Sequence, residues 1–272
     1  MFITFNIFQA FIIGICIGSF LNVVIYRLPN NLSIVKPRSF CPICKKRLTF
    51  FENIPLISWS IQKGSCRNCN KPIVFRYPLI ELITGLLFIV FRNSTPYMYS
   101  FSHDFIFNII FSWIFLSLLI CITFIDIDNL WIPQSLINLG FSSGILVLIF
   151  IEILNNTLLK SNLIIELLFS SAGAFVIFES LRIIAKYIFK KDAIGKGDSK
   201  LVAMIALWLG PIGVLLAVGI AYIVAALFCI LGISLKRIKL RQVIPFAPFL
   251  SIGGLIIWFN GNQFILEQLL KV

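Results

Sequence analysis

Long apolar stretches separated by short polar ones dominate the chain. Eight of them predict membrane-spanning helices, because a helix needs about 20 apolar residues to cross the hydrocarbon core of a bilayer. We expect them at 3–26, 78–92, 105–126, 136–154, 163–187, 199–210, 212–234 and 246–262. The second and sixth stretches are short, which leaves tilted, re-entrant or extended helices open for them.

Residues 27–77 form the one long polar stretch, and they hold four of the seven cysteines. We therefore expect a first transmembrane helix at 1–26, a small domain at 27–77 and a transmembrane domain at 78–272. The predicted fold class is an all-α polytopic membrane protein of about eight transmembrane helices, with the small domain between helices 1 and 2. In the first helix, Gly14 and Gly18 are spaced to let another helix pack closely.

The composition excludes a soluble protein. Hydrophobic residues make up 59% of the 272 residues and charged residues only 12%, and the mean hydropathy is +1.00. Soluble domains carry roughly 25% charged residues, so this chain could not cover a water-facing surface. Disorder and a secreted disulfide scaffold fit equally poorly.

The net charge of +12 follows from 23 Lys and Arg against 11 Asp and Glu. Most of the basic residues gather in three segments, 27–76, 182–200 and 236–241. Basic residues favour cytoplasmic loops, so all three segments are expected on the cytoplasmic side and both ends of the chain outside. The charge thus reflects topology beside a lipid bilayer, and no nucleic-acid partner is expected.

Four cysteines form two CxxC pairs with 21 residues between them: Cys41, Cys44, Cys66 and Cys69. Two such turns can complete a tetrahedron of thiolates around zinc. Disulfides are disfavoured on the reducing side of the membrane, while redox-active thiols remain an alternative. Four protein ligands leave no open position, so a zinc ion here would be structural and would stabilise a segment too small for its own core. The other cysteines are expected to be buried side chains within the spans: Cys16, Cys121 and Cys229.

Acidic residues at the ends of predicted spans are the candidates for chemistry. Asp126 and Asp128 end the third span, and Asp198 opens the sixth after Gly195 and Gly197. Ionisable groups at membrane depth are costly and usually face a bundle interior or a water-filled cavity. Two facing carboxyls can share a proton, so that one activates water while the other donates to a substrate carbonyl. Glycines permit close substrate approach. On the residues alone, helix capping or ion pairing by these aspartates is favoured over catalysis.

The chain resembles the prepilin peptidases, the type IV leader peptidase family of bifunctional membrane aspartic proteases. The motifs that carry the resemblance follow one another along nearly the whole chain: Gly18–Pro29, the paired CxxC motifs, Asn53–Trp59, Arg76–Leu82, Asp126–Pro133, Gly195–Asp198 and Ile244–Phe249. The resemblance implies that Asp126 and Asp198 are the catalytic pair. It implies supporting roles for Asp128, Gly195, Gly197 and Lys200. Gln134 departs from the acidic residue that is prominent in the family after the Ile-Pro pair.

The resemblance also implies a reaction and its place. The expected reaction cleaves the basic leader of prepilins and pseudopilins after a glycine, at the cytoplasmic face of the bacterial inner membrane. Members with the four-cysteine domain usually also methylate the new amino terminus with S-adenosylmethionine. Glu81 is the candidate to contact the amine or the methyl donor, against the plainer interpretation of a carboxylate at a helix start.

Other interpretations stay open. Two are an intramembrane protease of the same GxGD type acting on other substrates, and a non-enzymatic, zinc-stabilised membrane assembly protein. The acids gather at one face rather than along a path, which favours a protease at the membrane boundary. Glu179 and Arg182, three residues apart, are expected to form a structural ion pair. His103 lies in a predicted external loop and is given no role.

Overall fold

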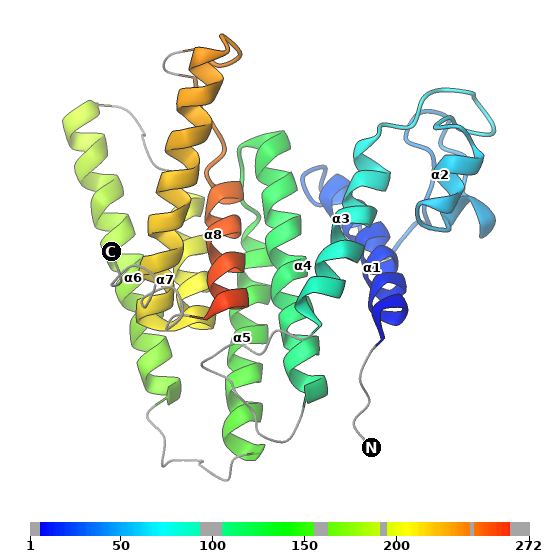
Figure 1. Ribbon diagram of the computed structural model, residues 1–272. Helices are drawn as coiled ribbons and strands as arrows, with labels where there is room; N and C mark the ends of the chain where they lie inside the picture. Colours follow the sequence, from blue (N-terminus) through cyan, green and yellow to red (C-terminus); the bar gives the residue numbers. More distant parts are fainter. Residues whose placement is uncertain (1–5, 93–104, 155–162, 191–194, 240–241, 262–272) are drawn as a thin grey trace. The chain divides into compact units, whose positions relative to one another are not determined.

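The computed structural model describes residues 6–92, 105–154, 163–190, 195–239 and 242–261, and nearly all of its regular structure is helical (Figure 1). The helices are α1 (Ile7–Arg27), η1 (Phe51–Asn53), α2 (Ile57–Ile61), α3 (Arg76–Phe91), α4 (Phe105–Asn129), α5 (Gln134–Leu154), α6 (Leu163–Phe189), α7 (Lys196–Ser234) and α8 (Ala247–Asn260). The all-α prediction is confirmed. The chain forms two compact units, divided within α4 between Cys121 and Ile122.

Four of the described helices are long and apolar enough to cross a membrane. The candidate spans are Ile7–Arg27, Phe107–Asn129, Leu163–Ile188 and Lys196–Ser234. Two shorter apolar helices are Gln134–Phe150 and Ala247–Asn260. The chain is therefore a helical membrane protein, and the expected number of eight crossings stays a prediction.

Helix α7 is broken in its middle. Gly210 has φ 73° and ψ −179°, a conformation outside the helical region, and Pro211 follows it. Proline has no N–H to donate to the preceding turn, and glycine adopts positive φ without steric cost. The 39 residues of α7 would be about 58 Å long as one straight helix, well beyond a hydrocarbon core of about 30 Å. The parts at 196–209 and 211–234 match the sixth and seventh predicted stretches.

In the first unit, α1 packs along α3 through glycines (Figure 1). A Cβ atom at Gly14 would lie 2.7 Å from the Cα of Gly85, and one at Gly18 would lie 2.8 Å from the Cα of Glu81. No side chain fits at such distances. The close helix packing predicted from the glycine pair is therefore confirmed.

The cysteines in the spans differ from expectation in two of three cases. Cys121 is buried as predicted, and Cys229 is partly exposed. Cys16 was expected to be buried, but it is exposed, because it lies on the face of α1 away from α3. The apolar character of a transmembrane stretch does not distinguish a lipid-facing position from a packed one, and this is why the prediction was wrong.

The segment between α1 and α3 is held to the end of α1 by a buried arginine. The Arg27 guanidinium donates hydrogen bonds to the carbonyl oxygens of Ser33 at 2.9 Å and Ile34 at 3.2 Å. Its side chain also lies over the ring of Phe40. An arginine serves here because its planar group offers several donors at once.

In the second unit, the first part of α7 forms the core. Residues Leu201 to Leu209 are buried without interruption. The Trp208 indole N–H donates to the carbonyl oxygen of Gly140 in α5 at 3.0 Å, and Ser171 of α6 donates to that of Ala203 at 2.8 Å. Helix α8 packs against α7 as well. The start of α7, which contains Asp198, is thus fixed by neighbours on several sides.

Candidate functional site

Asp126 lies in the last turn of α4, and its side chain is 6% exposed. Its Oδ2 accepts a hydrogen bond from the backbone N–H of Ala247 at 3.1 Å. Ala247 is the first residue of α8, where a backbone N–H has no partner inside the helix. The start of α8 therefore holds this carboxylate in place. Sequence reasoning missed this donor, because a backbone N–H leaves no mark on residue identity.

Asp198 lies in the first turn of α7 and is partly exposed. Its Oδ2 accepts the backbone N–H of Gly195 at 3.1 Å. The carboxylate thus does cap the start of the helix, as the alternative interpretation expected. It also lies close enough to Asp126 for the two charges to interact. Capping therefore orients the Asp198 carboxylate without removing it from the neighbourhood of Asp126.

Two contacts join the segment that contains Asp198 to the segment after Asp126. A Cβ atom at Gly197 would lie 2.9 Å from the Cβ of Ile132, so only glycine allows this approach. The Lys200 ammonium donates to the side-chain oxygen of Gln134. Gln134, which departs from the family pattern, thus offers lysine a neutral acceptor where an acidic residue would offer a charged one.

Asp128 takes a different position from Asp126. Two residues along an α-helix correspond to a rotation of about 200°, so the two side chains leave α4 on nearly opposite faces. Asp128 is exposed, whereas Asp126 is buried. Tyr222 of α7 is a further neighbour of Asp198 that sequence reasoning missed. Its ring also packs on that of Phe246, with centroids 5.2 Å apart.

The four predicted metal ligands form one cluster in the first unit. The sulfur atoms of Cys41, Cys44, Cys66 and Cys69 all lie within 4.8 Å of one another, and the Cys41 and Cys69 sulfurs are 4.0 Å apart. A disulfide would need about 2.05 Å. Four thiolates around zinc, with Zn–S distances near 2.3 Å, stand about 3.8 Å apart. The cluster therefore fits a tetrahedral zinc site and does not fit a pair of disulfides.

The two CxxC turns have the same backbone geometry. The N–H of Lys45 donates to the carbonyl oxygen of Cys41 at 2.9 Å, and that of Asn70 donates to Cys66 at 2.8 Å. Lys45 and Asn70 both have positive φ, at 58° and 53°. An antiparallel bridge closes each turn. Two equivalent turns thus bring their thiols into one cluster, although their sequences share little beyond the cysteines.

Hydrogen bonds give the thiols unequal acidity. The backbone N–H of Lys46 and the side chain of Asn68 lower the pKa of the Cys44 thiol to about 6. At Cys69 the backbone N–H of Lys71 acts in the same direction, but burial and the sulfurs of the other three cysteines raise the pKa of this thiol to about 11. Once one sulfur carries a negative charge, a second negative charge on a neighbouring sulfur is costly unless a metal cation is present.

Glu81 lies in α3 and is 9% exposed. Its Oε2 accepts the backbone N–H of Leu56 at 2.8 Å, and the Ser19 hydroxyl also donates to the carboxylate. Both donors are neutral, so neither cancels the negative charge. Glu81 lines a cavity of about 410 Å³ between the cysteine turns and the ends of α1 and α3. Glu81 thus has a structural partner and also reaches a cavity.

The remaining predicted residues have simpler outcomes. Glu179 and Arg182 form the predicted ion pair in α6, with Nε and Oε2 3.0 Å apart. His103 lies outside the described residues.

The fold and these two sites define a polytopic helical membrane protein with a pair of neighbouring aspartates and a four-cysteine cluster. Comparison with known families agrees. Residues 12–94 match the bacterial peptidase A24 N-terminal domain, and residues 113–230 match the type IV leader peptidase family. The chain belongs to the type IV leader peptidase family.

Several curated relatives share most of the chain. A prepilin leader peptidase/N-methyltransferase of Myxococcus xanthus is 37% identical over 209 residues, which cover 76% of this chain and 58% of the relative. Relatives of the same name from Aeromonas salmonicida and Legionella pneumophila are 32% and 30% identical, and they are covered over 90% and 96% of their lengths. No solved structure matches the chain.

Proposed function

We propose that this chain is a membrane aspartic endopeptidase that removes the leader peptide of prepilins and pseudopilins. The observation that carries the proposal is the neighbouring pair of Asp126 and Asp198 within one unit, brought together from motifs far apart in the sequence. The names of the relatives supply the substrate class. The apolar helices supply the membrane setting.

In the proposed reaction, the two aspartates share one proton and hold one water. The ionised carboxyl takes a proton from the water while the oxygen of the water attacks the scissile carbonyl carbon. The protonated carboxyl gives its proton to the carbonyl oxygen, which yields a neutral tetrahedral intermediate. When the C–N bond breaks, the leaving nitrogen receives a proton from the first aspartate. A hydroxyl of the intermediate returns its proton to the second aspartate as the new carboxyl forms on the leader. The proton inventory of the pair is then restored.

The surroundings of the pair suit this chemistry. The Ala247 N–H holds Asp126, and the Gly195 N–H holds Asp198, so neither carboxyl must be ordered when substrate binds. The close approach of Gly197 to Ile132 leaves little room beside Asp198. A narrow site fits cleavage after a glycine, the one residue whose backbone can approach without a side chain in the way.

We also propose that the chain methylates the new amino terminus of its product with S-adenosylmethionine. This donor supplies a methyl group bonded to a positively charged sulfur; the S–CH₃ bond breaks with its electrons left on sulfur, and the neutral amine forms the N–CH₃ bond and then loses a proton. The protein must bind the donor and the amine side by side and accept that proton. The relatives' names, which include N-methyltransferase, support this second activity.

The four-cysteine cluster is proposed to hold one structural zinc ion. Its sulfur spacing and its closed set of four ligands support this role. Cys41 and Cys66 also line the cavity beside Glu81, so the metal would fix one wall of it. We place this region and the aspartate pair on the cytoplasmic side of a bacterial inner membrane, because the basic residues gather in the segments next to them.

Cleavage by purified variants tests the peptidase. Asp126→Asn and Asp198→Asn keep the shape of each side chain but remove its ability to ionise. Each is expected to lower kcat/KM for prepilin cleavage by at least about 10³-fold, since each acts directly in proton transfer. Glu166→Gln is the matched control, because Glu166 is an exposed acid in the first turn of α6 that has no place in the described site, and it should retain most of the activity. Wild-type cleavage by a membrane-inserted Asp126→Asn or Asp198→Asn variant would refute the assignment.

A further inference from the structure

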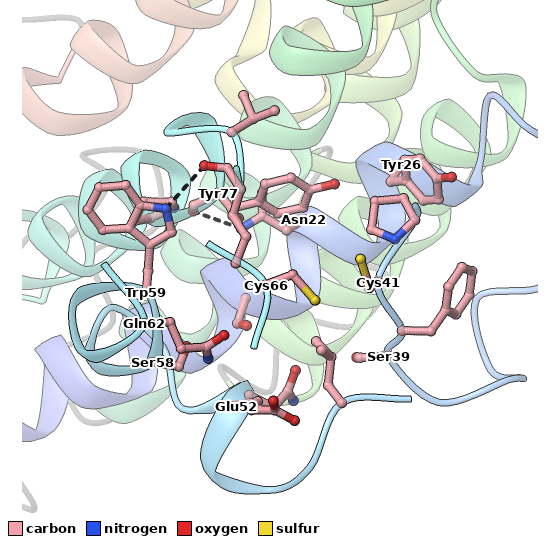
Figure 2. A pocket seen from close by; sticks show the side chains of 18 of the residues that line it. Asn22, Tyr26, Ser39, Cys41, Glu52, Ser58, Trp59, Gln62, Cys66 and Tyr77 are labelled. Atoms are coloured by element: carbon pink, nitrogen blue, oxygen red, sulfur yellow. Dashed lines mark hydrogen bonds between the residues drawn. The ribbon is translucent and has the colours of Figure 1, made fainter. Parts of the chain in front are cut away.

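The cavity in the first unit contains a buried polar atom without a partner. The Asn22 side chain is 4% exposed, and its Nδ2 donates to the carbonyl oxygen of Tyr77 at 3.0 Å (Figure 2). Its Oδ1 is buried and accepts no hydrogen bond from any described residue. Asn22 lines the cavity. A buried acceptor left unsatisfied is costly, so this oxygen points to a ligand that brings an N–H or O–H donor.

The charges around the cavity are of both signs. Its lining residues include two acids, Glu52 and Glu81, and two basic residues, Arg27 and the exposed Lys71. The Glu52 carboxylate is oriented by the backbone N–H and hydroxyl of Thr49, both at 2.8 Å. These donors are neutral, but the Glu52 carboxylate also interacts with the positive charges of Arg67 and Lys46. The two donors to Glu81 are neutral, so Glu81 is the stronger candidate to face a cation. The cavity therefore suits a ligand that carries a positive centre and a negative group at separate points.

Aromatic rings form much of the remaining wall: Tyr26, Phe40, Trp59 and Tyr77. Trp59 is fixed by its indole N–H, which donates to the carbonyl oxygen of Ile73 at 3.3 Å (Figure 2). Its ring also packs on that of Phe75, with centroids 5.7 Å apart. Aromatic faces bind planar rings and cations. A volume of about 410 Å³, mostly apolar with a few polar groups, is typical of a small-molecule site.

We propose that this cavity binds the methyl donor, an adenosyl sulfonium with an amino-acid end. The inference rests on the proposed methyltransferase function and assigns it a place. The ligand's chemistry matches the wall: a planar base for the aromatic rings, cationic sulfur and ammonium groups for Glu52 and Glu81, and a carboxylate for Lys71. The free Oδ1 of Asn22 accepts an N–H of the ligand. Glu81 thus acts as a binding residue through its charge, in addition to orienting Leu56.

The chemistry of the cavity lining distinguishes the methyl donor from a competing occupant. The processed amino terminus of a pilin also offers a positive nitrogen and apolar side chains. It offers no planar heterocyclic base beside its positive nitrogen, whereas the donor offers a base for the aromatic wall and a positive centre for the carboxylates. We therefore assign the cavity to the donor and treat the peptide as an outcome of the test.

Equilibrium binding of labelled S-adenosylmethionine to the purified, zinc-containing full chain in detergent tests the proposal. Ser58→Trp should fill the cavity, since Ser58 lines it from α2, and raise the Kd at least about tenfold. Ser60→Trp is the matched control, because Ser60 is an exposed residue of the same helix and does not line the cavity. Its Kd should stay within about twofold of wild type, as for most surface changes. Zinc content and melting temperature report whether each variant is folded.

A second measurement does not depend on the filled cavity. S-adenosylhomocysteine lacks the methyl group and the positive charge on sulfur, so the wild-type protein should prefer the sulfonium. Glu81→Gln keeps the hydrogen-bonding shape and removes the charge, and it should reduce this preference by about tenfold. A merely structural role for Glu81 would weaken both ligands alike and leave the preference unchanged.

The outcomes separate the two proposals. Three results would each overturn the cavity assignment. The first is unchanged donor binding in folded Ser58→Trp, and the second is an unchanged ligand preference in Glu81→Gln. The third is displacement of the bound donor by a processed pilin peptide. Wild-type protein that cleaves prepilin but binds no donor would overturn it as well and leave the peptidase standing. Protein that binds the donor in this cavity but cleaves nothing would refute the peptidase and support the cavity.

Discussion

The short distance between Gly197 and Ile132 restricts the position of the neighbouring Asp198 carboxylate. A Cβ at Gly197 would meet the Cβ of Ile132 at 2.9 Å, so the two backbones would have to separate. Asp198 is the next residue in the chain, and a shift of its carboxylate by a fraction of an ångström would spoil the geometry with Asp126.

Gly197→Ala should therefore lower prepilin cleavage by at least about tenfold, with a larger effect on kcat than on KM. Gly219→Ala is the matched control in the same helix, because a Cβ there meets nothing within 4 Å. Initial rates over a range of prepilin concentrations in detergent check both variants. Equal activity of the two alanine variants would show that the approach of Gly197 has no bearing on the reaction.

Residues with charged or sulfur-bearing side chains could be found from the sequence, and their environment could not. The four cysteines were predicted as one cluster from their spacing, and Asp126 and Asp198 were predicted as neighbours from topology and family resemblance. Their catalytic roles stay predictions. The donor that holds Asp126 is the backbone of Ala247, and the unpartnered oxygen of Asn22 belongs to an ordinary residue in an apolar helix. The identity of neither residue indicates a role, because the role depends on where the residue lies in the folded structure.

At the scale of elements, the α1–α3 contact should tolerate no side chain at Gly14. Gly14→Val would place its Cβ 2.7 Å from the backbone of Gly85. Overpacking of this kind costs about 1–3 kcal/mol, so the melting temperature of the solubilised protein should fall. Cys16→Val introduces the same side chain on the exposed face of the same helix and should leave the melting temperature nearly unchanged. A reversed order of the two variants would contradict the packing described here.

The two CxxC turns form an element that should take up zinc with release of protons. At pH 7, the Cys44 thiol, with its pKa of about 6, is mostly ionised, whereas the Cys69 thiol, with its pKa of about 11, still carries a proton. Zinc binds thiolates, so the Cys69 proton must leave on binding. Zinc affinity should accordingly rise with pH, and below about pH 6 a further proton at Cys44 must be displaced.

Calorimetry of zinc binding to chelator-treated protein, repeated in buffers of different ionisation enthalpy, measures the released protons. About one zinc per chain is expected, and Cys41→Ser combined with Cys66→Ser should abolish high-affinity binding. Heats that do not depend on the buffer at pH 7 would contradict the proton release. Metal analysis without zinc in protein kept reduced would contradict the metal site itself.

The helical elements themselves were predictable because transmembrane stretches are long and apolar. All eight predicted stretches contain helix, and the break between the sixth and seventh falls at Gly210 and Pro211. The equivalence of the two CxxC turns was not foreseen, since it lies in the positive φ of Lys45 and Asn70 and not in shared sequence. The exposed position of Cys16 was also missed, because apolar residues serve both lipid-facing and packed sides of a helix.

For the whole molecule, the division into two units parallels the two proposed reactions. The aspartate pair lies in the second unit, and the cysteine cluster with the donor cavity lies in the first. Both reactions act on the same substrate end in turn, and this requires the cavity and the aspartates to open on the same side of the membrane. The orientation of the spans is therefore a condition for the whole proposal.

The break in α7 makes this orientation testable at one point. If its two parts each cross the bilayer, Gly210 lies outside, while the basic segments around Lys190 and Lys236 lie in the cytoplasm. Alkaline phosphatase, which is active only outside the cytoplasm, should then be active when fused after Gly210 and inactive when fused after Lys190 or Lys236. A fluorescent protein that folds only inside should show the reverse pattern. Phosphatase activity after Lys190 or Lys236, or its absence after Gly210, would mean that α7 does not form two crossings. The prediction of eight membrane crossings would then be wrong. The argument that places every basic segment and Asp198 on the cytoplasmic side depends on that number and would be wrong as well.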